Sequence, residues 1–404
     1  MAPHAASCGL ETPPTATTDP TRPQQEGHLL MTVQPVLAAA LRFITPTLPP
    51  IDRVFDDYSS SFSDGLLTNG NVVGRLEAAV AERLGVSHCV AVSSCTSGLM
   101  LVLRALGIHG DVILPSFTFF ATGHAALWNG LNIVFADCDR NTWTIDPTDV
   151  EARINRRTGA ILGVHLYGNP ASIEALQYIA TRHGLKLIFD AAHAFGSSYR
   201  GRPLGGFGDA EVFSLSPTKL LVAGEGGLVC TNDATLARLI RAARNYGDTG
   251  SYDPELLGLN ARMPEFNAAL ALAGLDLLDD KVKRHNHIAE LYTSLLADTP
   301  GVEFQNVDIA DCSAYKDFSV LISPAQFGRS RDDVAEALLA QGIPTKKYFY
   351  PPLHRQKLFA SRGVAHDLRN TDSVSERVLS LPIYSSLTDE IVERIALAIR
   401  RLGS

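Results

Sequence analysis

Short apolar runs alternate with amphipathic segments along most of the chain. Apolar residues at i, i+3, i+4 and i+7 predict helices over residues 72–84 and from Thr96, as the N-cap, to Gly107. Strands are predicted at residues 89–93, 112–114, 133–135, 160–165, 185–189, 213 and 228–230. Further helices are predicted at residues 119–128, 147–154, 171–183 and 234–244. This alternation is typical of an α/β fold with a mostly parallel central sheet.

The last third of the chain has a different pattern. A long helical stretch over residues 264–297 precedes a strand at 318–322 and helices at 332–341 and 389–402. We predict that the long stretch links a large domain to a smaller α+β domain.

Three segments are therefore predicted. Residues 31–297 form the large domain, which begins with a short helical pattern at 33–43, and residues 298–404 form the small one. Residues 1–30 carry hardly any large apolar side chains, so a disordered tail is predicted there. Translation could start at Met1 or at Met31.

Composition narrows the classes of partner. The 404 residues have a net charge of -8, which gives no basic surface for nucleic acid. No apolar run approaches the roughly 18 residues of a membrane span, and the start lacks the layout of a signal peptide. The six cysteines show no close CxxC spacing, so neither a metal site nor a disulfide framework is indicated, and a cytoplasmic location is expected.

Lys219 is the first candidate for chemistry. It lies between an apolar run that ends near Leu215 and a turn that contains Gly224, Gly226 and Gly227. Partial burial lowers the pKa of an amine, and a fixed backbone directs it at one electrophile, so Lys219 suits Schiff-base chemistry. The alternative is an ordinary surface lysine in a turn.

Two further stretches offer groups for an anion and for a cationic ring. Thr96 and Ser97 lie where a buried strand meets a helix N-terminus, which suits a phosphate, although plain N-capping is the alternative. Asp190 ends an apolar run and needs a partner, such as a protonated pyridine nitrogen. It could instead cap the next segment.

An aromatic residue completes the set. Phe119 could stack on a flat ring, or it could belong to the core. Taken together, these residues call for a flat, protonated nitrogen heterocycle that carries a phosphate and an aldehyde. Pyridoxal 5'-phosphate (PLP) has this set of groups.

Several motifs occur in a fixed order between Gly65 and Thr388. They are Val90–Gly98, Leu114–Phe119, Val164–Pro170, Asp190–Gly196, the Lys219 loop, Gly258–Met263 and Leu379–Pro382. With these motifs the chain resembles the DegT/DnrJ/EryC1/StrS aminotransferases, which are sugar-modifying PLP enzymes. The resemblance implies the aspartate aminotransferase fold (fold type I).

The resemblance also implies residue roles. Lys219 would bond the PLP aldehyde as a Schiff base, and Asp190 would pair with the ring nitrogen. Phe119 would stack on the ring, and His193 would lie near its hydroxyl. The remaining implied contacts are Thr96, Ser97 and Ser214 to the phosphate, Asn260 or Arg262 to the phosphate of a neighbouring subunit in a homodimer, and Tyr350 and His354 at the substrate pocket.

The implied activity is transfer of an amino group from glutamate or glutamine to a keto sugar. A nucleotide-linked (dTDP) 4-keto-6-deoxyhexose is favoured, and amination at C3 stays open. Amination of cyclitols, formation of an aminobenzoate, and a catalytically silent PLP-binding regulator are alternatives. A nucleotide-binding Rossmann protein is disfavoured, because the glycines at 224–227 precede a strand instead of a helix.

Overall fold

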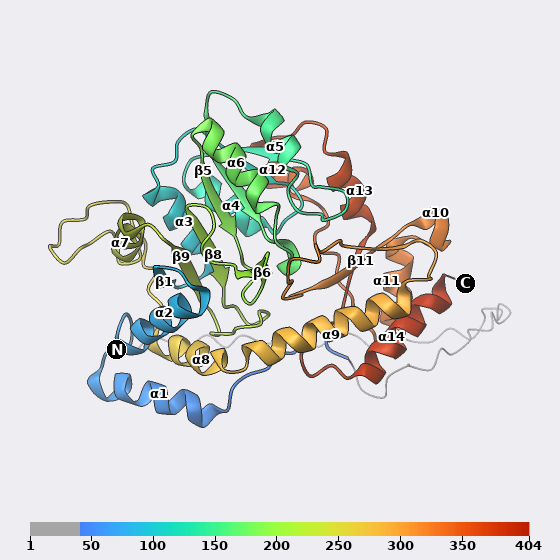
Figure 1. Cartoon of the computed structure of the whole chain (residues 1–404), viewed down its shortest axis with the longest axis horizontal. Coiled ribbons are helices and arrows are strands. Elements are labelled where there is room, and N and C mark those ends of the chain that lie inside the picture. Colours follow the sequence, from blue (N-terminus) through green and yellow to red (C-terminus); the bar gives the residue numbers. More distant parts are fainter. Residues whose placement is uncertain (1–40, 404) are drawn as a thin grey trace, which may run out of the picture. The chain divides into compact units, whose positions relative to one another are not determined.

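An eight-stranded sheet is the centre of the computed structural model, which describes residues 41–403 (Figure 1). Its strands, in spatial order, are β1 (His88–Val92), β9 (Gly227–Thr231), β8 (Ala210–Ser214), β5 (Lys186–Asp190), β4 (Thr158–Val164), β2 (Asp111–Pro115), β3 (Asn132–Ala136) and β12 (Gly363–Val364). Six of these strands, from β8 to β12, run parallel, and β9 is antiparallel to both of its neighbours. The mostly parallel sheet predicted from the alternating pattern is confirmed.

Helices cover both faces of this sheet, and alternate strand residues feed two separate cores. On one face lie α2 (Asn71–Leu84), α5 (Pro147–Arg153), α6 (Ile173–His183) and α8 (Glu265–Leu275), with α1 (Ile51–Asp64) packed outside α2 and α8. On the other face lie α3 (Cys95–Ala105), α4 (Phe120–Trp128) and α7 (Ala234–Ala243). Strand residues with odd and even numbers therefore both enter apolar layers, which explains the continuous apolar runs in the sequence.

A second, antiparallel sheet lies in the last third of the chain. Its order is β10 (Val302–Phe304), β11 (Phe318–Ile322) and β13 (Val378–Leu381). The helices α9 (Leu278–Leu296), α11 (Arg331–Ala340) and α14 (Asp389–Leu402) close its core. Short elements complete the chain: β6 (Ser198–Tyr199), β7 (Arg202–Pro203), η1 (Leu166–Gly168), α10 (Pro324–Phe327), η2 (Leu353–Arg355), α12 (Lys357–Ala360) and α13 (Arg369–Arg377).

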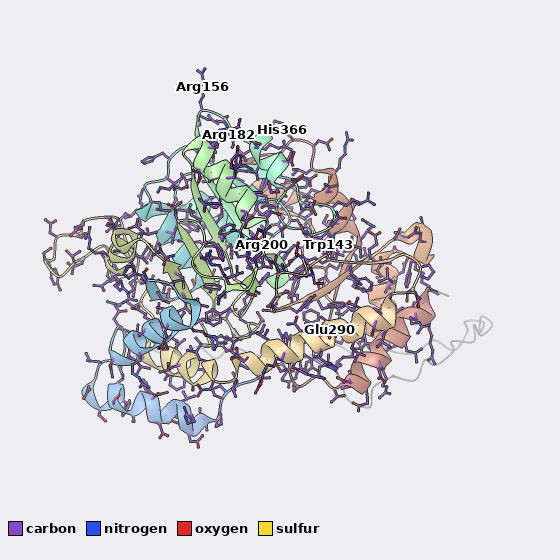
Figure 2. All side chains as sticks on the ribbon, in the orientation of Figure 1. Trp143, Arg156, Arg182, Arg200, Glu290 and His366 are labelled. Atoms are coloured by element: carbon purple, nitrogen blue, oxygen red, sulfur yellow. The ribbon has the colours of Figure 1, made fainter. Side chains whose placement is uncertain are left out.

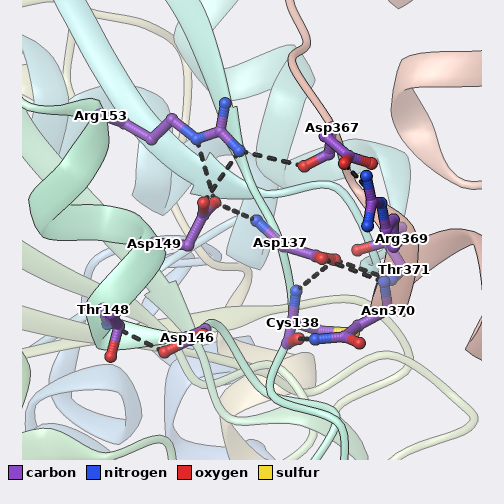
Figure 3. A network of polar contacts seen from close by, with 10 residues as sticks. All are labelled: Asp137, Cys138, Asp146, Thr148, Asp149, Arg153, Asp367, Arg369, Asn370 and Thr371. Carbon is purple, nitrogen blue, oxygen red and sulfur yellow. Dashed lines mark hydrogen bonds and ion pairs between the residues drawn. The ribbon is translucent and has the colours of Figure 1, made fainter.

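A polar network ties α13 to the edge of the large sheet (Figure 3). The carboxylate of Asp137, just after β3, accepts hydrogen bonds from the backbone N–H groups of Asn370 (3.0 Å) and Thr371 (2.7 Å). The Asp137 N–H donates to Asp149 at 2.7 Å, and Asp149 pairs with Arg153 at 2.8 Å. An acidic group at the first turn of α13 is also favoured by the helix dipole.

Several predictions about elements need correction. Ser94, not Thr96, caps α3, because the Ser94 hydroxyl accepts the Ser97 N–H and the helix begins two residues earlier than predicted. The long stretch 264–297 is two helices, α8 and α9, separated by a tight turn in which the Leu277 N–H bonds the Gly274 carbonyl at 3.2 Å. The pattern missed this turn because apolar residues continue through it, without a proline to mark the end of the first helix.

The N-terminal predictions are only partly open to comparison. The tail 1–30 lies outside the described residues, as does the predicted helix 33–43 up to residue 40, and residues 41–43 are not helical. The helix α1, which the sequence pattern did not predict, begins directly after Pro50. The boundaries at 30 and 297 stay predictions. Within residues 41–403, no helix is long and apolar enough to cross a membrane, and the cytoplasmic location also stays a prediction.

Candidate active site

A cavity of about 360 Å³ opens at the carboxyl ends of β2, β4, β5 and β8. This end of the strands is where open α/β sheets bind their ligands, and the volume suits a small organic ligand. Six of the residues predicted from the sequence line it: Thr96, Phe119, Asp190, His193, Ser214 and Lys219.

Lys219 is held by its own loop between β8 and β9. The Lys219 N–H bonds the Ser216 carbonyl at 3.0 Å, and the Ala223 N–H closes the loop onto Leu215 at 2.8 Å. On the outer side, the buried amine of Lys281 donates to the Leu220 carbonyl at 2.9 Å. The loop is therefore fixed at both ends, and the Lys219 side chain reaches the cavity.

Burial changes the state of the Lys219 amine. Loss of hydration and, to a smaller extent, the positive charge of Lys316 lower its pKa to about 8, against the opposing effects of Asp317, Cys95 and Asp190. An amine with a pKa near 8 is partly neutral at physiological pH, so it can act as a nucleophile or as a base. The alternative of an ordinary surface lysine is wrong.

Asp190 lies at the end of β5, opposite the first turn of α3. Its carboxylate accepts hydrogen bonds from the Thr122 hydroxyl (2.8 Å), the Ala192 N–H (3.1 Å) and the Cys95 thiol (3.8 Å). All three donors are neutral, and burial raises the pKa of Asp190 above its ordinary value. A cationic partner in the cavity would stabilise the ionised carboxylate.

Another part of the cavity lining is suited to an anion. Ser94, Thr96, Ser214, Ser216 and Thr218 bring hydroxyl groups to its lining, and the first N–H groups of α3 have no partner within the helix. A methyl group added at Gly227 would lie 2.5 Å from the Ser94 carbonyl carbon, so only glycine lets β9 approach this turn.

His193 and a group of aromatic rings form one side of the cavity. The His193 ring lies parallel to Tyr167 and to Phe349, with centroids 6.3 and 6.1 Å apart. Its Nδ1 accepts the Tyr167 N–H at 3.2 Å, and burial lowers its pKa, so the ring is neutral with its proton on Nε2. Trp143, labelled in Figure 2, packs edge-on against Tyr167 and is 1% exposed.

Phe119 lies at the mouth of the cavity with 42% of its surface exposed. Its ring centroid is 3.9 Å from that of Phe120 and 6.0 Å from that of Phe349. The alternative of a core position for Phe119 is therefore wrong, since a face of the ring remains available to a ligand.

Three predicted phosphate residues do not reach the cavity of their own chain. The Ser97 hydroxyl bonds the N–H of Ser94 at 3.0 Å and so belongs to the helix cap. Asn260 pairs with Asn245 across a backbone bridge, and Arg262 donates to the Asn245 side chain at 2.8 Å. Their predicted contact to a neighbouring subunit remains a prediction.

The two predicted substrate residues also lie outside the lining. Tyr350 is 47% exposed, and its ring packs under the guanidinium of Arg331 at 4.8 Å. His354 bonds the Ser116 hydroxyl at 2.7 Å and the Asp372 carboxylate at 3.1 Å. The neighbouring Tyr348 and Phe349 line the cavity instead, although their signal in the sequence, an aromatic run, was the same.

Lys316 and Asp317 are the site residues that the sequence reasoning missed. They line the cavity, are 5% and 2% exposed, and form an ion pair at 2.7 Å. They lie at the end of the loop between β10 and β11, about a hundred residues beyond Lys219 in the chain. Adjacent opposite charges before an apolar strand were their only signal in the sequence, and such pairs usually lie in solvent.

Comparison with known proteins places this geometry among aminotransferases. The model of the DegT/DnrJ/EryC1/StrS aminotransferase family matches residues 53–400. A solved structure titled as DesI in the presence of its TDP-sugar product has a TM-score of 0.85 and 39% identity, covering 90% of this chain and 94% of that chain.

Two curated relatives carry names of sugar-modifying enzymes. A UDP-N-acetyl-3-dehydro-alpha-D-glucosamine 3-aminotransferase of Acidithiobacillus ferrooxidans is 37% identical over 358 residues, which cover 87% of this chain and 94% of the relative. A dTDP-4-amino-4,6-dideoxy-D-glucose transaminase of Escherichia coli is 36% identical over 357 residues, covering 87% and 95%.

Proposed function

Because the chain belongs to the DegT/DnrJ/EryC1/StrS aminotransferase family, we propose that it moves an amino group from glutamate or glutamine to a nucleotide-linked keto sugar, with PLP bound in the cavity. The observation that carries the proposal is that one cavity holds Lys219, Asp190 and the first turn of α3. The rest of the assignment concerns the roles of these residues.

The cavity fits PLP on its own chemistry. Asp190 is buried, is bonded by neutral donors and has a raised pKa, so it lacks the cation that a protonated pyridine nitrogen would provide. The hydroxyl groups and free N–H groups around Thr96 and Ser214 suit a phosphate. The partly neutral Lys219 suits an aldehyde.

Each residue then has a role. PLP supplies an aldehyde and an electron-accepting ring, while the protein supplies position and charge. Asp190 would hold the proton on the ring nitrogen, Phe119 would stack on the ring, and His193 would donate from Nε2 to the ring hydroxyl. The amine of Lys219 would take the proton from the α-carbon of the amino donor. Burial in the cavity excludes bulk water from this proton transfer.

The sugar is proposed from the relatives. The Escherichia coli relative and the DesI structure support a dTDP-linked 4-keto-6-deoxyhexose as the acceptor. The Acidithiobacillus relative, which is equally similar, carries a name that places the amine at C3 of a UDP-linked sugar. Amination at C3 is therefore the second candidate.

A homodimer is proposed as the working unit. Asn260 is exposed, and Arg262 is placed beside it by Asn245, while neither reaches the cavity of its own chain. In a homodimer, these residues would contact the phosphate bound by the neighbouring copy. A measured molar mass of a monomer in solution at assay concentration would contradict this arrangement.

A substrate panel tests the function. The purified protein with PLP is mixed with glutamate or glutamine and with dTDP-linked 4-keto, dTDP-linked 3-keto and UDP-linked 3-keto sugars, and products are detected by mass spectrometry. We expect an amine product from the dTDP-linked 4-keto sugar. Product only from a 3-keto sugar would support the second candidate. Absence of any reaction with every donor would support a silent regulator instead.

A further inference from the structure

The cavity must accommodate the charge of the amino donor as well as that of the cofactor. Among the described residues that line it, the only lysine or arginine side chains are Lys219 and Lys316. His193 is kept neutral by burial. Under the proposed function Lys219 is committed to the cofactor, so Lys316 is the one remaining lysine or arginine in this lining.

Lys316 is held firmly in place. Its backbone N–H donates to the Tyr167 carbonyl at 2.8 Å, and its amine donates to the Asp317 carboxylate at 2.7 Å. The same amine lies 5.5 Å from the centre of the Tyr348 ring. An ammonium group has three N–H donors, so donors remain for a ligand after the bond to Asp317 is made.

Asp317 bonds Lys316 through only one of its two carboxylate oxygens. One oxygen of the Asp317 carboxylate bonds Lys316, and the other is buried without a hydrogen-bond partner among the described residues. A buried carboxylate oxygen without a donor is costly, and a buried ion pair is weak evidence for stability. The pair is therefore poorly explained as a stabilising contact alone.

The two substrates differ in how far their negative charge lies from the reacting carbon, and this difference indicates which substrate contacts Lys316. The α-carboxylate of an amino acid donor is attached to the carbon that gives up its proton to Lys219. A nucleotide-linked sugar carries its negative charge on the diphosphate, which the sugar ring separates from the reacting carbonyl. Lys316 and Lys219 line the same cavity. A carboxylate on the carbon that reacts beside Lys219 therefore enters the lining that Lys316 shares.

We propose that Lys316, positioned by Asp317, binds a carboxylate of the amino donor in this cavity. This inference rests on the proposed function and adds the group that recognises one of its two substrates. The bond is a charge-assisted hydrogen bond from the Lys316 amine to the carboxylate. The sugar half of the reaction does not use it.

The test separates the two half-reactions. Lys316→Met keeps the apolar stem and removes the charge. With PLP-loaded protein, we expect the KM for glutamate to rise about 10- to 100-fold, which is the usual effect of losing one charged hydrogen bond. The reverse half-reaction, from the aminated sugar, should stay within about threefold. Lys316→Arg should restore part of the glutamate affinity.

A binding measurement supports the kinetic one without turnover. Glutarate carries the carboxylates of glutamate but has no amine to react, and its Kd can be measured by calorimetry. We expect Lys316→Met to weaken glutarate binding about tenfold or more and Asp317→Asn to weaken it less. Lys283→Met, at a surface lysine whose side chain is 79% exposed, should leave glutarate binding unchanged.

The outcomes are distinct. Unchanged KM for glutamate and unchanged glutarate Kd in a folded Lys316→Met variant would overturn the inference. Equal losses in both half-reactions would also overturn it, because the lysine would then act on Lys219 or on the fold. If the wild-type protein carries out neither half-reaction, the proposed function fails first.

Discussion

The floor and the wall of the cavity differ in how the chain builds them. On the floor, Asp190 ends β5, and Lys219 follows β8 by five residues, so each is placed by the strand before it. On the wall, Lys316, Tyr348 and Phe349 arrive in loops from the last third of the chain. Sequence patterns can locate the floor, whereas only tertiary contacts locate the wall.

This difference corresponds to a division of labour. Under the proposed function the floor carries the chemistry common to the family, and the wall carries contacts to the substrates. Substitutions in the floor should therefore abolish turnover, and substitutions in the wall should change the preference for one substrate over another.

Lys219→Ala should give the largest effect. Without the amine, neither the bond to the cofactor nor the proton transfer can occur, and turnover should fall by about 1,000-fold or more. Circular dichroism and a melting curve check that the fold persists. Substantial turnover by the purified variant would show that the floor has been assigned wrongly.

Asp190→Asn should come next, with a loss in turnover of about 100-fold or more, because the amide cannot hold the proton on the ring nitrogen. The same change should stabilise the cofactor-free protein. Burial raises the pKa of the Asp190 carboxyl group in the folded protein above its ordinary value of 3.8. The contribution of this group to stability is therefore complete below pH 3.8, where it is protonated in both the folded and the unfolded protein. This contribution is lost as the pH rises through the folded pKa.

The gain in Tm from Asp190→Asn should therefore be larger at pH 7 than at a pH close to the ordinary value of 3.8. We expect about 1–3 °C at pH 7, measured by calorimetry on the cofactor-free protein. A lower Tm for the variant at pH 7 would mean that the carboxylate stabilises the empty fold, against the account given for its raised pKa.

Gly227→Ala tests the phosphate end of the floor without touching a reactive group. The new methyl would lie 2.5 Å from the Ser94 carbonyl carbon and displace the first turn of α3. We expect a loss of about 1–3 kcal/mol in unfolding free energy and weaker PLP binding. Gly74→Ala in α2 is the control, because nothing lies within 4 Å of the added methyl, and it should be neutral or stabilising.

Tyr350→Phe should give the smallest effect. The Tyr350 ring packs under Arg331 outside the lining, and the phenylalanine ring keeps this packing. We expect kcat/KM for the sugar to stay within about twofold, as for most surface changes. A tenfold loss would place Tyr350 at the substrate, as the sequence resemblance implied, and would extend the wall by one residue.

Much of the fold followed from periodicity. The strand β11 and the helix α14 match their predicted bounds. The family, the aminotransferase class and the fold class are also confirmed. The period of apolar residues and the glycines that end helices are local properties, so they can be recognised in a single sequence. The turn between α8 and α9 was missed because apolar residues continue through it, without a proline to mark the end of α8.

Site residues could be predicted from the sequence only where they come shortly after the end of a strand. Asp190 and Lys219 were predicted from the apolar runs before them, and both line the cavity. Ser97 was predicted as a phosphate contact, but its hydroxyl bonds the Ser94 N–H, which depends on which residue begins the helix. Lys316 could not be predicted, because its position depends on the Tyr167 carbonyl and the Tyr348 ring, which distant parts of the chain bring to it.

The central claim is that the amine of Lys219 is the group that bonds the cofactor. Borohydride reduction of the PLP-loaded protein, followed by proteolysis and mass spectrometry, locates this bond directly. The account predicts a single phosphopyridoxyl group on the peptide that contains Lys219. A label on Lys316 or Lys281 in its place, or no label at all, would contradict it.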